Sequence, residues 1–165
     1  MRNLMIAIGL AAAAACGPSS AEVRTAKTTQ YNADPHQILQ LAMEATRETY
    51  ALGDVSEDRL EFITAPKFYS PEGDLESPGA GGVIHMRNGT VEVMFIVQVV
   101  TTADHRVAVT VIPKTFQHIG GSPKPRELAP DDPYLPPFVL GRADSLAMAI
   151  YEHAKGYAAA PPGAS

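Results

Sequence analysis

The fold of this chain is decided by the run VEVMFIVQVV at residues 91–100. Many of its residues are β-branched, and apolar side chains fill every odd-numbered position, which is typical of a strand with one face in a core. The run is too short to span a membrane, which takes about twenty residues. We therefore expect a strand whose inward side chains are Val91, Val93, Phe95, Val97 and Val99.

The opposite face of this strand carries Glu92 and Gln98, but also the apolar Met94 and Ile96. A strand with one solvated face would place polar side chains there, so these two residues need cover. Two alternatives stay open. The cover comes from the chain itself, through a proline-rich loop or a helix, or it comes from a partner or an apolar ligand. Met94 and Ile96 are therefore candidate binding residues.

The dipeptide Asn88-Gly89 separates this run from a second apolar stretch at residues 83–87. Asn-Gly between two such stretches is a strong signal for a two-residue hairpin turn. The turn would pair Arg87 with Thr90, Met86 with Val91, His85 with Glu92, and Ile84 with Val93.

This register would place His85 and Glu92 side by side on the face that points away from the core. A carboxylate beside an imidazole is half of a general-base arrangement, so the two residues are candidate catalytic groups. No serine or cysteine nucleophile is apparent beside them. The alternative is a solvent-facing pair that contributes roughly a few tenths of a kcal/mol.

Further elements surround the run. A strand is predicted at residues 60–64, with an extension past Pro66 left open, and another at residues 106–116 after a turn at 102–105. A helix is expected to begin with Asp34 as its cap, to include a capping box with Gln37, and to end at Gly53. A final helix would begin between residues 141 and 144 and end at Gly156.

These elements predict an α+β fold. Three to four antiparallel strands would form a meander, flanked by an N-terminal and a C-terminal helix, and the helices would cover one face in a two-layer sandwich. We expect one domain at residues 34–157 and a disordered tail at residues 158–165.

The segment PDDPYLPPF at residues 130–138 lies in a long proline-rich loop. Proline-rich segments lose little entropy when they dock, which suits them to recognition. Tyr134 and Phe138 are therefore candidate binding residues. The alternative is a stiff loop that packs both rings onto the domain's own core.

The N-terminus has a distinct order. Arg2 is followed by an apolar run at residues 4–10, by small residues at 11–15, and by Cys16, the only cysteine. This order resembles the signal sequence of a bacterial lipoprotein precursor. The resemblance implies a signal peptide at residues 1–15 and a diacylglyceryl group with palmitate chains on Cys16. Because Gly17 follows the cysteine, it also implies an outer-membrane location facing the periplasm. Residues 16–33 are mostly polar and lack periodicity, so we expect a flexible tether there.

Other readings of the N-terminus stay open. An ordinary secretory signal, cut after Ala15 or Ala21, would release a soluble protein, and the cut after Ala21 would discard Cys16. A cytoplasmic chain is the third alternative. A net charge of −5 without basic clusters argues against nucleic acid as a partner. The five histidines form no pairs at metal-binding spacing, so we predict neither a metal site nor a cofactor.

The sequence thus favours an envelope lipoprotein that contacts the membrane through its lipid and whose small domain binds another envelope protein or an apolar ligand. A periplasmic, hydrolase-like enzyme built on His85 and Glu92 is one alternative. A structural subunit of an envelope assembly is another.

Overall fold

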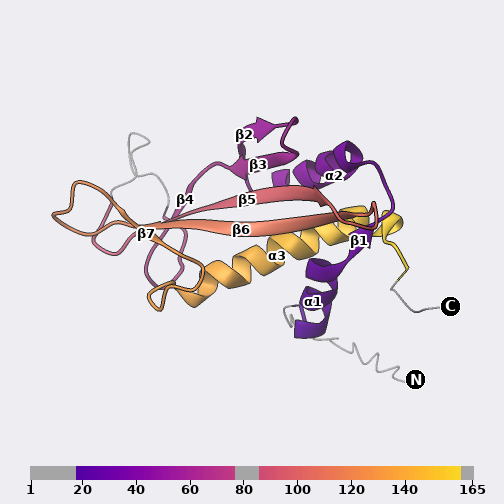
Figure 1. The fold of residues 1–165 in the computed structure, drawn as a ribbon. Helices are drawn as coiled ribbons and strands as arrows, with labels where there is room; N and C mark the ends of the chain where they lie inside the picture. Colours follow the sequence, from indigo (N-terminus) through magenta and orange to yellow (C-terminus); the bar gives the residue numbers. More distant parts are fainter. Residues whose placement is uncertain (1–17, 77–85, 161–165) are drawn as a thin grey trace, which may run out of the picture.

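The run at residues 91–100 lies at the centre of the sheet. In the computed structural model, which describes residues 18–76 and 86–160, the run forms strand β5 (Val91–Thr101) and pairs along its whole length with β6 (Val107–Gln117). The two long antiparallel strands form the centre of the sheet in Figure 1. Both predicted strands and the turn between them are confirmed.

Shorter strands complete an antiparallel sheet with seven strands in the described ranges. The second edge of β5 is shared by β3 (Glu61–Thr64) and β4 (Lys67–Tyr69), and β2 (Leu52–Ser56) pairs with β3. Two short strands, β1 (Gln30–Tyr31) and β7 (Arg126–Leu128), pair with the two ends of the outer edge of β6. The α+β prediction is confirmed, although the sheet has more strands than the expected meander.

The predicted hairpin register at Asn88-Gly89 is wrong. The position opposite Glu92 is taken by Phe68 of β4 on one side and by Phe116 of β6 on the other. The turn itself exists, because the Thr90 N–H donates to the Arg87 carbonyl at 3.1 Å. Gly89 has φ +90°, and the described non-glycine residues with positive φ do not include Asn88. Positive φ at the third turn residue alone is the type II pattern, which does not match the twist of a two-stranded hairpin.

Three helices in the described residues pack on one another and cover one face of the sheet: α1 (Ser20–Thr28), α2 (Pro35–Arg47) and α3 (Pro137–Ala154). A short 3₁₀ helix, Lys155–Tyr157, follows α3. In Figure 1, α3 runs along the two long strands. None of the described helices is long and apolar enough to cross a bilayer.

The helix α2 confirms the predicted N-terminal cap and corrects the predicted end. The Asp34 carboxylate accepts hydrogen bonds from the backbone N–H groups of His36 and Gln37. The Gln37 side chain donates to the Tyr157 hydroxyl at 2.7 Å instead of returning to the cap, so the capping box is not completed. The helix ends at Arg47 and not at Gly53, because the backbone turns back there to enter β2.

Most of the described part of the predicted tether, residues 18–33, forms secondary structure. The Ser19 hydroxyl accepts from the Glu22 N–H, and the Glu22 carboxylate accepts from the Ser19 N–H at 2.7 Å, so a complete capping box begins α1. β1 follows, and its Tyr31 is 1% exposed. The prediction of a flexible tether is therefore wrong beyond residue 18, while residues 16 and 17 lie outside the described ranges.

The C-terminal boundaries also differ from the prediction. α3 begins at Pro137, with Pro136 at the cap position, rather than between residues 141 and 144. The predicted tail is bound at its start, because Ala158 bridges to Tyr31 and the Ala159 N–H donates to the Gln30 carbonyl at 2.8 Å. Residues 161–165 lie outside the described ranges.

The core lies between the helix layer and the inward face of β5. The five predicted inward residues of β5 are all buried, and Phe95 is fully enclosed at 0% exposure. The helices contribute a second set of buried apolar side chains, which includes Ile38, Leu39, Ala42, Val139, Leu146 and Ile150.

Candidate functional site

The face of the sheet that points away from the helices carries a row of apolar side chains. Cross-strand pairing aligns Ile63, Ile96 and Ile112, and Met94 is the next outward residue of β5. Phe68 and Phe116 flank Glu92 at the other end of the same face. All six side chains are half-buried. We call Ile63, Phe68, Met94, Ile96, Ile112 and Phe116 the apolar row.

No described helix covers the apolar row. The buried core, together with the partly buried residues that pack against it, includes none of its six members among the residues that the structure describes. The helices contact the sheet through the opposite face, where Val93, Phe95 and Val97 are buried. Cover by a helix, one of the two ways in which the chain itself could cover Met94 and Ile96, is therefore absent from the described residues.

Polar side chains border the apolar row and are already engaged with one another. Glu61 accepts from Arg59 at 3.0 Å and from the Gln98 side-chain amide at 3.0 Å. The Lys114 ammonium lies 5.8 Å from the centroid of the Phe116 ring. Next to Ile63 and Ile96, an open hollow of about 260 Å³ extends toward β2. The face therefore has an apolar centre, a hydrogen-bonded rim and one shallow depression.

Glu92 does have an imidazole partner, but the partner is His118. The His118 Nε2 lies 3.1 Å from the Glu92 carboxylate, and both side chains are about four-fifths shielded. The Phe68 ring lies 6.2 Å from the His118 ring, centroid to centroid. The predicted partner His85 lies outside the described residues. His118 could not be predicted as the partner, because it follows β6 and only the pairing of β6 with β5 brings it beside Glu92.

The Glu92–His118 pair can fix the orientation of an imidazole. Nucleophilic catalysis also needs a hydroxyl or thiol within hydrogen-bond distance of the imidazole. Among the described residues, no side-chain hydroxyl makes a hydrogen bond with His118. The pair therefore supplies a base without a nucleophile in this part of the chain.

The structure separates Tyr134 from Phe138. Tyr134 is 67% exposed, and the Arg126 guanidinium lies 5.1 Å from its ring centroid. Phe138 belongs to α3, and its ring lies 5.4 Å from that of the buried Tyr69. Phe138 therefore packs onto the domain's own core, as the alternative reading expected, whereas Tyr134 is free to contact other molecules.

A cluster of two tyrosines and two cations joins β4 to α3, and the sequence reasoning missed it. The Arg142 guanidinium lies 4.3 Å from the Tyr69 ring centroid, and the Lys67 ammonium lies 4.5 Å from the Tyr50 ring centroid. Burial raises the pKa of Tyr50 to about 12, with a smaller contribution from Tyr69. Burial, together with the nearby Arg142 charge, lowers the pKa of Lys67.

The same cluster is tied down by backbone contacts. Lys67 donates to the Thr49 carbonyl at 2.6 Å, and Arg142 donates to the Gly73 carbonyl at 3.0 Å. Gly73 has φ +99°, and a Cβ at this position would lie 2.9 Å from the Phe138 ring, so a side chain would be both strained and crowded there. These contacts fix the loop after β4 to the first turns of α3, which gives the cluster a structural role.

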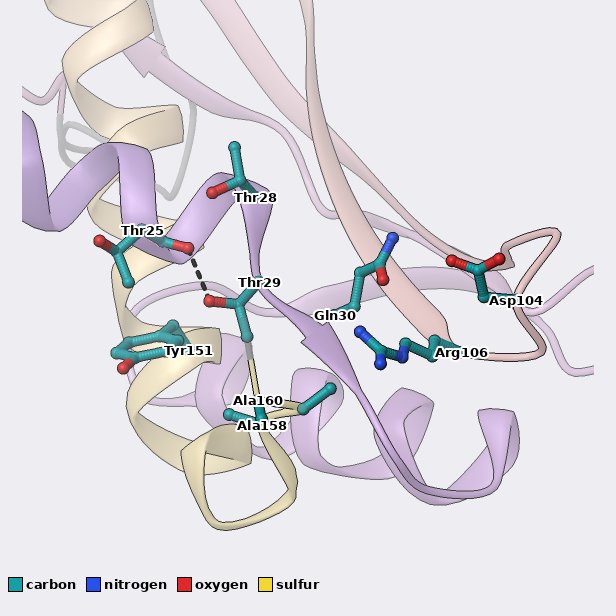
Figure 2. A pocket seen from close by; sticks show the side chains of 10 residues that line it. Thr25, Thr28, Thr29, Gln30, Asp104, Arg106, Tyr151, Ala158 and Ala160 are labelled. Carbon is teal, nitrogen blue, oxygen red and sulfur yellow. Dashed lines mark hydrogen bonds between the residues drawn. The ribbon is translucent and has the colours of Figure 1, made fainter. Parts of the chain in front are cut away.

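A cavity of about 740 Å³ lies at the end of the sheet where α1 leads into β1. Figure 2 shows Tyr151 on one side of it and Asp104 and Arg106 on the other, with Gln30 between them. Its walls also include three threonines and three alanines: Thr25, Thr28, Thr29, Ala158, Ala159 and Ala160. The threonine hydroxyls donate to backbone carbonyls of α1, as for Thr29 to Thr25 at 2.7 Å. None of the predicted site residues lines this cavity.

Cys16 lies outside the described residues, as does His85. Within the described ranges, no three histidine, cysteine, aspartate or glutamate side chains come together in a way that could hold a metal ion. Comparison of the chain with protein-family models, with curated proteins and with solved structures gives no match. The function must therefore be argued from the chemistry of the surfaces described above.

Proposed function

We propose that this chain is a lipoprotein of the bacterial cell envelope whose domain binds another envelope protein through the apolar row. The observation that carries the binding function is the alignment of Met94 and Ile96 with Ile63 and Ile112 on the face that no described helix covers. The envelope location is supported by the order of charge, apolar run, small residues and sole cysteine at residues 2–16.

A protein is a better occupant of this face than an apolar small molecule. Sites for small molecules are concave and enclose most of the ligand. The hollow beside Ile63 and Ile96 is open, and the rest of the face is a sheet surface. An apolar centre within a polar, hydrogen-bonded rim is the usual composition of a protein–protein interface. The net charge of −5 also disfavours contact with anionic lipid headgroups.

The proposed anchor would hold the domain close to the membrane. Three residues lie between Cys16 and the first residue of α1, so four Cα–Cα steps separate the two. A chain of this length spans at most about 14 Å when fully extended. A partner that reaches the apolar row would therefore be an integral or lipid-anchored protein of the same membrane, or one bound close to its surface.

The anchor is tested by replacing Cys16 with serine in the native host. We expect the wild-type chain to incorporate radiolabelled palmitate and to sediment with membranes, and C16S to lose both properties because serine has no thiol to carry the diacylglyceryl group. Intact-mass measurement of the mature N-terminus is the second readout. Equal membrane partition of C16S and wild type would contradict the lipoprotein assignment.

The binding function is tested with a photo-crosslinking residue at Met94 in the full-length protein. We expect one discrete adduct with an envelope protein, and none from the same residue at Leu140, which is 45% exposed on the helix layer. The adduct partner is then purified and titrated with wild type and with a Met94→Thr, Ile96→Thr double variant. Threonine keeps the strand propensity, so the fold should be retained. The loss of two apolar side chains from the interface should weaken binding at least tenfold.

Three results would contradict this proposal. Equal adducts from Met94 and Leu140 would indicate nonspecific contact, and unchanged affinity of the double variant would exclude the apolar row as the interface. An adduct between two copies of this chain would replace the envelope partner with self-association. A stoichiometric complex that survives detergent extraction would favour the structural-subunit alternative over a reversible binding module.

A hydrolase-like enzyme is the second candidate, and the 3.1 Å contact between Glu92 and His118 favours it. An imidazole held by a carboxylate can act as a general base toward a water molecule. Hydrolysis of a panel of acyl esters by wild type and by Glu92→Gln and His118→Gln variants tests it. Activity that falls at least a hundredfold in both folded variants would favour the enzyme, and equal background rates would exclude it.

A further inference from the structure

The outer edge of β6 is paired only at its two ends. β1 pairs with Val107 and Ala108, and β7 pairs with residues 115–117. Between them, residues 109–114 have no strand partner on this edge within the described ranges. The interruption is a gap of defined length between two strands that lie in the same line.

The direction of the backbone groups in this gap follows from the hydrogen bonds at both ends of the β5–β6 pair. The His118 N–H donates to the Thr90 carbonyl at 2.8 Å, and the Arg106 carbonyl accepts from the Thr102 N–H at 2.8 Å. Even-numbered residues of β6 therefore direct their backbone groups toward β5, because the direction alternates along a strand. The odd-numbered residues of the gap direct theirs toward the open edge.

Three residues consequently present unpaired backbone groups in the gap. Val109 and Val111 each offer an N–H and a C=O, while Pro113 offers only a C=O because proline has no N–H. No described side chain makes a hydrogen bond to these groups. Proline is tolerated at this position because its missing donor faces the open edge and not β5.

The space beside the gap is not filled by the helix layer. A cavity of about 90 Å³ adjoins residues 109–111 and is lined by Ala143 and Ala147 of α3 and by Lys27 of α1. Both alanine side chains end at Cβ, and they are themselves 6% and 8% exposed. Lys27 is half-exposed and is held by an ion pair with Asp144 at 2.7 Å, a contact that a flexible side chain gives up at little cost.

We propose that this edge of β6 binds an extended segment of about five residues from a partner protein, which adds as a strand between β1 and β7. Only an extended peptide presents donors and acceptors with the two-residue repeat that Val109, Val111 and Pro113 require, about 6.8 Å. Main-chain hydrogen bonds would supply affinity, and side chains directed at Ala143 and Ala147 would supply specificity.

The geometry of the gap disfavours a second copy of this chain as the occupant. β6 is 11 residues long, so a second β6 laid along the edge would overlap β1 and β7. A short segment that leaves the sheet at both ends avoids this overlap. The proposed segment binds at the edge of the sheet and not on the apolar row, so it does not depend on the function proposed above.

The test uses the full-length protein in detergent and capped pentapeptides in which threonine alternates with alanine, valine, leucine or phenylalanine. We expect at least one of them to slow amide hydrogen exchange at Val109 and Val111 at least tenfold. The same peptide with N-methyl groups on the residues that face β6 should have no effect. An Ala143→Leu, Ala147→Leu variant, which fills the cavity, should weaken the protection at least tenfold.

Three outcomes would overturn the proposal. Val109 and Val111 amides as strongly protected as Val107 in the free protein would show that the edge is already paired. Unchanged exchange with all four peptides would show that the edge does not accept a strand. Protection confined to β5 residues around Met94 and Ile96 would also count against the edge, while it would support the apolar row.

Discussion

Tyr31 and Tyr50 connect single buried side chains to the stability of the whole domain. Burial raises the pKa of each to about 12, with smaller contributions from Tyr151 at Tyr31 and from Tyr69 at Tyr50. In an unfolded chain a tyrosine titrates near about 10. Between these values the unfolded state has released the proton that the folded state retains, so stability decreases as the pH rises.

We therefore expect the titration of these tyrosines to have no effect on the free energy of unfolding below about pH 9. Between about pH 10 and 12 the free energy of unfolding should fall, and each tyrosine should contribute up to about 1.4 kcal/mol for every pH unit. Urea unfolding at a series of pH values measures this slope. Tyr31→Phe removes one titrating group and should reduce the slope. An unchanged slope in that variant would contradict the role of Tyr31.

Glu92 illustrates what could be predicted for a single residue. Its outward direction follows from alternation along the strand and is confirmed by its position opposite Phe116. The identity of its partner does not follow from the sequence, because Asn88-Gly89 predicts a local hairpin, whereas His118 is 26 residues away in the chain. The dipeptide Asn-Gly is compatible with both a type II and a type I′ turn, so it does not by itself specify a hairpin. Packing decides that β4 and not residues 83–87 pairs with this edge of β5.

At the scale of elements, α1 depends on its capping box more than the longer helices depend on their caps. It is nine residues long and contributes a single buried residue, Ala26. Helices this short are marginal without support at their ends. The hydrogen bonds from Ser19 lower the pKa of the Glu22 carboxyl. The capping box is therefore complete at pH values above the ordinary pKa of a carboxyl, and it weakens as acid protonates Glu22.

We expect Ser19→Ala to destabilise α1 by about 1 kcal/mol, because the Glu22 N–H loses its acceptor. Hydrogen exchange of the α1 amides should accelerate about fivefold, while the β5 amides remain unchanged. Ser20→Ala is the matched control, since the Ser20 side chain makes no hydrogen bond in the described residues. Equal acceleration in both variants would mean that the loss of hydroxyls, and not the cap, matters.

The elements that could be predicted are those with a long repeating pattern. β5, β6 and α2 each repeat an apolar period over ten or more residues. β2 (Leu-Gly-Asp-Val-Ser) and β7 (Arg-Glu-Leu) have no such period, and they are strands because neighbouring strands offer them hydrogen bonds. The Ser19-Glu22 capping box was a readable signal for α1 that the expectation of a tether obscured.

For the whole molecule, placing all described helices on one face of the sheet is what creates the apolar row. Helices on both faces would have buried Met94 and Ile96 inside the domain. The same arrangement, with β1 and β7 pairing only the ends of β6, leaves the gap at residues 109–114. The two proposed binding surfaces are therefore consequences of topology, and they are adjacent because both include β6.

The sequence by itself determined the α+β class, the two long strands, the inward face of β5 and the cap of α2, because each of these depends on a local period or a local hydrogen bond. It also marked Met94 and Ile96 as residues that need cover. Only the tertiary structure decided the order of the strands, the pairing of Glu92 with His118, the packing of Phe138 on Tyr69 and the open edge of β6. These features join residues far apart in the chain, and competition among strands and helices for the same edges and faces selects them.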